Sequence, residues 1–162
     1  DWGATIEFSP GALANAVIDV RIDTASLSSG NGERDRGIRG EVWFNVMGFP
    51  SARFLSTSIA QGSEAGFVAV GELSIKGIRR PVVAPFSWSE EGGTNLRGEI
   101  VLDRRHFNIG EGEWALDPLV AFNVTVRHDL RLRKPDSLAS VDLRALNNSG
   151  PGPNIVRPNV LQ

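Results

Sequence analysis

Few side chains in this sequence have the type and spacing that chemistry requires. There are two histidines, His106 and His128, and no cysteine, so thiolate nucleophiles, disulfides and cysteine-ligated metal centres are excluded. The histidines and nearby carboxylates could supply a Ser–His–Asp set, but no G-x-S-x-G nucleophile elbow accompanies them. The glycine-rich stretch 110–114 lacks the strand–turn–helix setting of a phosphate loop. We therefore expect that this protein is not an enzyme.

His128 is a polar side chain within a long apolar alternation. Over residues 118–133 the other even positions are apolar and the odd positions are mostly polar, which predicts a strand with one dry face. His128 should therefore point inward, as a hydrogen-bonded core histidine, as a partner for a quinone carbonyl or an alcohol, or as a haem ligand. His106 and Met47 are the other candidate haem ligands, and His106 lies in a turn where we expect a surface position.

Shorter copies of this alternation precede residue 118. Apolar residues occupy alternate positions in the segments 4–8, 18–22, 67–75, 82–88 and 96–102, and residues 52–59 suggest a further strand with a weaker pattern. Gly77 and residues 91–94 have the composition of turns between neighbouring strands. About seven strands in one continuous meander predict an all-β fold, either a barrel or a sandwich.

One segment breaks the alternation and is expected to cap the fold. Residues 33–40 are rich in charge and predict a short helix, which Arg34 and Asp35 would fix against the barrel by a charge-assisted hydrogen bond. Pro50 should end any helix beyond it. The cap would be completed by the large apolar side chains that follow the helix, joined by one from further along the chain: Trp43, Phe44, Phe49 and Trp114.

Length and charge restrict the class of protein. The 162 residues suit a single domain, and a formal net charge of −2 argues against nucleic-acid binding, which needs a strongly basic surface. No apolar run approaches the roughly 20 residues of a membrane-spanning helix. The composition changes near Pro135, so we expect a β-domain over 1–134 and an extended tail rich in proline and asparagine over 135–162. Asp1 falls within a strand pattern, as if an upstream segment had been removed.

The order of several motifs resembles that of the YceI-like family over residues 2–134. The motifs are Ile22-Asp-Thr-Ala-Ser-Leu27, Glu33-Arg-Asp35, Trp43-Phe-Asn45, Phe49-Pro-Ser-Ala-Arg-Phe54, Gly71-Glu-Leu-Ser-Ile-Lys-Gly-Ile-Arg-Arg-Pro-Val82 and Asp103-Arg-Arg-His-Phe-Asn-Ile-Gly110. The opening Asp1-Trp-Gly-Ala4 resembles the branch of the family fused to, or encoded near, b-type transmembrane cytochromes. The resemblance implies a lipocalin-like antiparallel β-barrel, exported to the bacterial periplasm, with an apolar tunnel for an isoprenoid chain.

This chain departs from the family pattern at both ends. The hairpin that usually precedes the position of Trp2 is absent, so we expect two unpaired sheet edges. The tail 135–162 extends beyond the usual last strand and could line the tunnel mouth, cover the open edge or bind a partner.

The resemblance implies the ligand, and the inward alternation predicts which residues would line its site. The ligand would be an amphiphilic isoprenoid lipid, a quinone or a polyprenyl chain, with no covalent cofactor and no metal. An alternative is an accessory subunit of a membrane respiratory or photosynthetic electron-transfer complex, bound through the tail. The predicted ligand-binding residues are Ile18, Val20, Ile22, Trp43, Phe44, Phe67, Ala69, Gly71, Leu73, Phe86, Ile100, Phe122, Val124 and His128.

Overall fold

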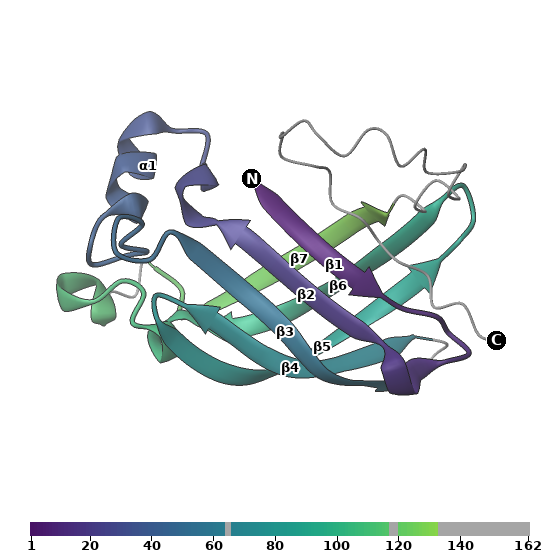
Figure 1. The fold of residues 1–162 in the computed structure, drawn as a ribbon. Coiled ribbons are helices and arrows are strands. Elements are labelled where there is room, and N and C mark those ends of the chain that lie inside the picture. The colour runs from purple at the N-terminus through teal and green to yellow at the C-terminus, as the bar shows by residue number, and fades with distance from the viewer. Residues whose placement is uncertain (64–65, 117–119, 133–162) are drawn as a thin grey trace, which may run out of the picture.

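The computed structural model describes residues 1–63, 66–116 and 120–132, and these residues form an antiparallel β-sheet curved into an open barrel (Figure 1). The expected all-β, lipocalin-like architecture is confirmed. The strands are β1 (Trp2–Glu7), β2 (Val17–Asp23), β3 (Ser51–Gln61), β4 (Phe67–Ile75), β5 (Ile78–Ser89), β6 (Thr94–Asp103) and β7 (Asn123–Leu132). The tail 135–162 and its expected role lie outside the described residues.

The seven strands pair in the order of the sequence, as a meander requires. Each pairs antiparallel with its neighbour, from Ile6 opposite Ile18 in the first pair to Gly98 opposite His128 in the last. Within the described part of the chain, β1 and β7 do not pair with each other, so each has a free edge. The expected pair of unpaired edges is therefore present.

Turn chemistry sets the register between β4 and β5. Lys76 and Gly77 both have positive φ, 50° and 74°, as the two-residue hairpin of the I′ type requires. Gly77 has a second reason to be glycine, because a Cβ there would lie 2.7 Å from the Phe49 ring. Ile75 and Ile78 flank this turn as a cross-strand pair.

The expected helix is α1 (Gly32–Arg39), and it lies with the segment after β6 at one end of the barrel (Figure 1). The Asn31 side chain caps it by accepting bonds from the amides of Glu33 and Arg34. Asp35 accepts bonds from Ser29 at 2.6 Å, so it ties the helix to the loop before it and not to the barrel. The expected role of Arg34 is wrong, because Arg34 is exposed and Arg39 reaches the Leu27 carbonyl instead, at 2.8 Å.

The last strand is shorter than its alternation suggests. Residues 118–133 predict one strand, but β7 begins at Asn123. The main-chain N–H of Arg104 donates to the Phe122 carbonyl, and the Arg104 side chain bonds the Ala121 carbonyl. These bonds hold residues 121–122 against the turn after β6, so Phe122 does not continue the inner face of the strand.

Candidate functional site

A cavity of about 740 Å³ lies inside the barrel, between the inner face of the sheet and the capping loops. Aliphatic side chains from β2 to β7 form most of its walls. Most of the predicted ligand-binding residues line it, namely Ile18, Val20, Ile22, Trp43, Phe44, Ala69, Leu73, Phe86, Ile100, Val124 and His128. The structure therefore brings these side chains to one surface, and what they bind stays a prediction.

Phe67 lies outside this lining because it closes one end of the barrel. Its ring packs edge-on against Phe8, with ring centroids 4.9 Å apart, and stacks on Phe86 at 5.6 Å. Phe8 also contacts Trp88 at 4.6 Å. These rings join the apolar core, which also includes the buried Ile6. The cavity therefore runs from Phe86 toward the opposite, capped end.

Gly71 is also outside the lining, because the Phe54 ring covers it. A Cβ on Gly71 would collide with the Leu55 carbonyl and approach the Phe54 ring to 2.7 Å. Phe54 lines the cavity in its place. The sequence suggests that small residues leave room inside the barrel, and Ala69 and Ala84 do lie on the cavity wall, but the space above Gly71 belongs to an aromatic ring.

The His128 ring covers Gly98 in the same way as the Phe54 ring covers Gly71. It pairs with Gly98 across β6 and β7, and its Nε2 would lie 2.7 Å from a Cβ at that residue. The ring is half-buried in the cavity wall, and this burial lowers the pKa of His128 below its ordinary value. The imidazole is therefore mainly neutral near pH 7, with one N–H donor and one nitrogen acceptor.

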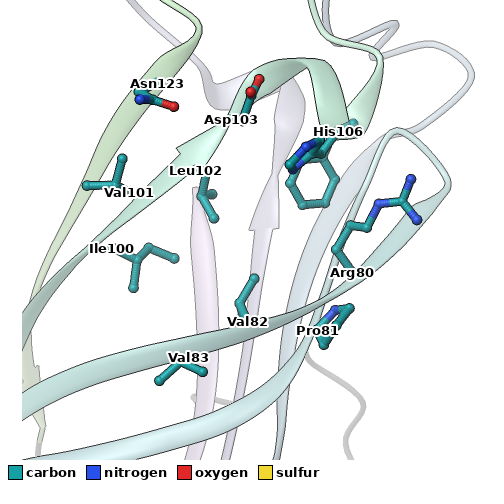
Figure 2. Close-up of a pocket in the computed structure, with 11 residues that line it drawn as sticks. Arg80, Pro81, Val82, Val83, Ile100, Val101, Leu102, Asp103, His106 and Asn123 are labelled. Atoms are coloured by element: carbon teal, nitrogen blue, oxygen red, sulfur yellow. The ribbon is translucent and has the colours of Figure 1, made fainter.

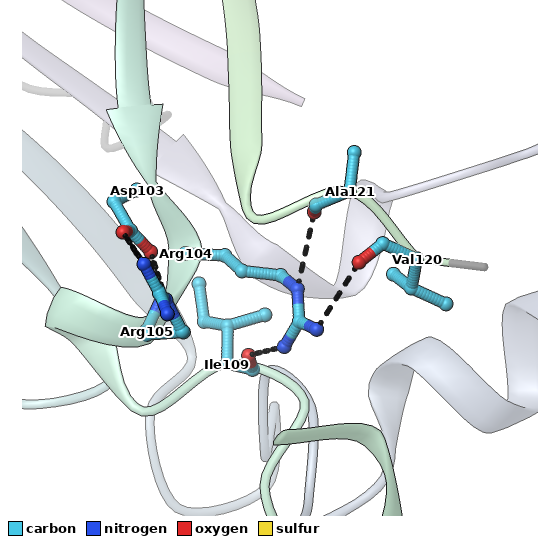
Figure 3. Close-up of polar contacts among 6 residues, drawn as sticks. All are labelled: Asp103, Arg104, Arg105, Ile109, Val120 and Ala121. Atoms are coloured by element: carbon cyan, nitrogen blue, oxygen red, sulfur yellow. Dashed lines mark hydrogen bonds and ion pairs between the residues drawn. The ribbon is translucent and has the colours of Figure 1, made fainter. Parts of the chain in front are cut away.

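Arg104 stabilises the capped end of the cavity. It is only 3% exposed, and its five N–H groups all donate to main-chain carbonyls, those of Ala121, Ile109, Gly110, Trp114 and Val120. Figure 3 shows the bonds to Ala121, Ile109 and Val120. A single guanidinium thus ties together three separate stretches of loop. Its donors are saturated, so a ligand's polar group would have to displace a carbonyl to bond it.

Aromatic rings surround this arginine and complete the cap. The guanidinium of Arg104 lies 5.3 Å from the centroid of Phe122, and that of Arg105 lies 4.0 Å from it. Phe122 is thus held in the cap rather than in the cavity wall. Trp43 packs on Trp114 at 5.7 Å and faces the cavity. Phe49 lies over Gly77 instead of joining them.

The outer turn beside Arg104 carries a strong ion pair. Arg105 donates to Asp103 through Nη2 at 2.6 Å and Nε at 3.0 Å (Figure 3). These bonds lower the pKa of Asp103 to about 2. Asp103 also accepts the Arg105 amide and so caps the 3-10 turn η3 (Arg104–Phe107). This pair stabilises the turn at the capped end, and neither residue lines the main cavity.

A second hollow, of about 610 Å³, separates the first half of β5 from the second half of β6 (Figure 2). Val82 and Val83 line it from β5, and Ile100 and Val101 line it from β6. His106 is exposed, as expected, and lies at its rim.

The main cavity also opens between the free edges of β1 and β7. Val124 and Val126 belong to the inner face of β7, yet they are 44% and 37% exposed. Trp2 on β1 lines the same opening and is 54% exposed. The inner alternation of β7 is therefore correct, but its first half faces an unclosed side of the barrel.

Several lining residues are missing from the sequence-based set. Ala84 and Leu96 belong to recognised stripes, whereas Phe54 lies on a strand whose pattern is weak. Leu27 and Ile109 lie in loops and Phe107 ends the short turn η3, where no periodicity marks the inward side. Over residues 1–63, 66–116 and 120–132, no three His, Asp or Glu side chains cluster as metal ligands, and no helix is long and apolar enough to cross a membrane.

Comparison with known proteins agrees with this geometry. The chain is similar to BcnA of Burkholderia cenocepacia, with 28% identity, a TM-score of 0.77 and coverage of 80% of this chain and 82% of that one. The YceI protein of Campylobacter jejuni shares the fold, with a TM-score of 0.70 and coverage of 84% and 82%, at 18% identity.

Curated sequences give the same relationship over a shorter stretch. A UPF0312 protein of Pseudomonas savastanoi pv. phaseolicola is 30% identical over 92 residues, and one of Azotobacter vinelandii is 32% identical over 92 residues. Each match covers 57% of this chain and 48% of the relative, so the chain spans about half the length of these relatives. The YceI-like domain itself matches residues 1–132. Because that match covers most of the sequence, the chain belongs to the YceI-like domain family.

Proposed function

We propose that this protein is a non-enzymatic binding protein that holds the hydrocarbon chain of an isoprenoid lipid inside the barrel. The observation that carries the proposal is the continuous apolar cavity of about 740 Å³. Its size lies within the roughly 300–1,000 Å³ typical of small-molecule sites. Phe86 bounds it at one end and Trp43 lies at the other, so a long, thin ligand suits it better than a compact one.

Burial alone would provide most of the affinity. Each CH₂ group removed from water contributes about 0.8 kcal/mol, so a few isoprene units would bind without any polar contact. The ligand is amphiphilic in this proposal, a quinone or a polyprenyl alcohol. The neutral His128 imidazole offers its head group one donor or one acceptor within the apolar wall.

The proposed setting is the bacterial periplasm, where the protein would carry the lipid between membrane-bound partners or sense its level. The apolar chain would be shielded from water by the barrel during transfer. Both the compartment and the lipid are part of the proposal, and they rest on the resemblance and on the cavity.

Native mass spectrometry of gently purified protein tests this function. We expect a mass increase that organic extraction assigns to an isoprenoid at one per chain. Protein purified without ligand should also take up a geranylgeranyl probe with saturation at one equivalent. A protein that carries no lipid and does not bind the probe would contradict the proposal.

A second candidate function is that of an accessory subunit in a membrane electron-transfer complex. The free edges of β1 and β7 favour it, because unpaired strands and the exposed Trp2, Val124 and Val126 suit a protein partner. The tail 135–162, proposed as the attachment, lies outside the described residues. Co-purification with a cytochrome complex in mild detergent would support this role, and a lipid-loaded monomer would favour the carrier.

A further inference from the structure

The barrel wall contains a slit where β5 and β6 separate. The two strands pair only from Phe86 opposite Gly98 to Ser89 opposite Asn95. Continued in the same register, the pairing would bring Val83 opposite Val101, but the hollow of about 610 Å³ lies between the strands there (Figure 2). The slit is therefore a defect in a ladder whose two strands both continue past it.

Proline explains why this ladder stops. Because Ile75 and Ile78 close a two-residue hairpin, they exchange main-chain bonds, and the even residues of β5 bond β4. The odd residues of β5 then turn their main-chain groups toward β6. Two of these are Pro81 and Pro85, which have no N–H to donate. The sequence thus prevents β5 from closing on β6 at the slit.

The slit adjoins the main cavity, and its outer rims, here called the lips, are the apolar side chains of Val83 on β5 and Val101 on β6. Ile100, Leu102 and Phe107 line both hollows, so these side chains lie between the slit and the interior. On the outer surface, Val83 and Val101 are each 62% exposed. Strand faces that point to solvent normally carry polar side chains, and valine on both lips is suited to contact with hydrocarbon.

The opening between β1 and β7 differs from the slit in its capacity for main-chain pairing. β1 and β7 contain no proline, so both free edges keep every main-chain donor and can accept an added strand. The side between them can therefore be closed by pairing, whereas the slit cannot. The slit therefore stays open when the edges are paired.

We propose that the slit between β5 and β6 is a side portal through which the hydrocarbon chain of the lipid enters and leaves the barrel. This inference rests on the proposed function. Entry requires Ile100, Leu102 and Phe107 to change rotamer, and it requires no main-chain hydrogen bond to break. The chain would pass between Val83 and Val101 and come to rest along Ala84 and Phe86.

A cleavable cross-link across the lips tests the portal. The chain has no cysteine, so Val83→Cys with Val101→Cys gives a unique pair for a disulfide-containing bismaleimide. The matched control is Ser87→Cys with Arg97→Cys, an exposed cross-strand pair at a place where β5 and β6 are hydrogen-bonded to each other. The readout is the rate at which bound anthraniloyl-geranylgeraniol moves from the full chain into phosphatidylcholine vesicles.

The cross-linked lip variant should release the probe at least about tenfold more slowly, with the fraction bound at equilibrium unchanged. Reductive cleavage of the linker should restore the original rate, and the cross-linked control should release at that rate throughout. Unchanged release from the cross-linked lip variant would overturn the portal and leave the binding function intact. A protein that binds no probe before cross-linking would contradict the proposed function, and the portal with it.

Discussion

The His128 ring packs directly on Gly98, and it can do so only because residue 98 has no side chain. The pair is in register across β6 and β7, and the imidazole fills the space where a side chain on residue 98 would begin. On its other side Gly98 faces the Pro85 carbonyl of β5, which a Cβ would also meet. The glycine therefore holds three strands close together at the lower end of the slit.

Gly98→Ala should destabilise the protein by about 1–3 kcal/mol, because the added methyl meets a main-chain oxygen as well as the His128 ring. Urea unfolding measures the change. The control is Gly37→Ala, since that glycine lies in α1 with nothing near the added methyl, and alanine there is expected to be neutral or slightly stabilising. A Gly98→Ala protein as stable as the wild type would show that the strands can separate at no cost.

Ala84→Phe should abolish uptake of the geranylgeranyl probe while the fold remains. Ala84 lies on the cavity wall, and a phenyl ring there would occupy the space that the ligand needs. Ala60→Phe is the matched control, because Ala60 is exposed on the outer side of β3. Probe titration followed by energy transfer from tryptophan compares the two variants. Equal affinity in both would place the ligand elsewhere on the protein.

The strands and most of the cavity wall could be predicted from the sequence because inward residues recur with period two. That periodicity identifies Val20, Leu73 and Ile100 without any contact information. Periodicity cannot show which small residue is covered by a neighbouring ring. The sequence therefore places Gly71 on the cavity wall, whereas in the structure the Phe54 ring covers it. The wall that loops supply, such as Leu27, has no period to detect.

The cap shows the same limit more clearly. Arg104 lies in a run of charged residues that suggests a solvated turn, yet it is buried among carbonyls from three loops. Those carbonyls belong to the main chain, which carries no residue-specific signal. Only the tertiary arrangement shows that an arginine with five donors is needed there.

Arg104→Met should cost at least about 3 kcal/mol of unfolding free energy, because five buried or part-buried main-chain carbonyls lose their donor. Arg104→Lys should recover only part of the loss, since lysine has three donors and no planar fork. Arg127→Met is the control, because its pair with Glu99 is mostly exposed and contributes within about 1 kcal/mol. Chemical denaturation ranks the three variants, and a small effect at Arg104 would contradict its role in the cap.

Acid should weaken the turn after β6 in a defined interval. The bonds from Arg105 hold the pKa of Asp103 at about 2, below its ordinary value of 3.8. The stabilisation is thus complete above about pH 4 and is lost as the pH falls toward 2, where the folded state also takes up the proton. Asp103→Asn should remove this part of the pH dependence, which unfolding curves at pH 5, 3 and 2 would measure. A wild-type curve and a variant curve that fall in parallel would contradict the assignment.

Binding of an apolar chain should depend on the protonation of His128. Burial lowers the pKa of His128, and a ligand that displaces water from the cavity should lower it further. When the bound form has the lower pKa, protonation opposes binding, so the affinity for the geranylgeranyl probe should fall once the pH drops below the already lowered pKa of His128 in the free protein. NMR titration of the His128 ring with and without the probe measures both values.

His128→Gln should keep the affinity measured near pH 7 to within about tenfold and lose its decline in acid, because glutamine is polar but does not titrate. His106→Gln is the matched control, since His106 is exposed and lies outside the lining of the main cavity. That variant should keep the wild-type pH profile. A decline that persists in His128→Gln would show that His128 does not cause the pH dependence, and would remove His128 from the head-group position.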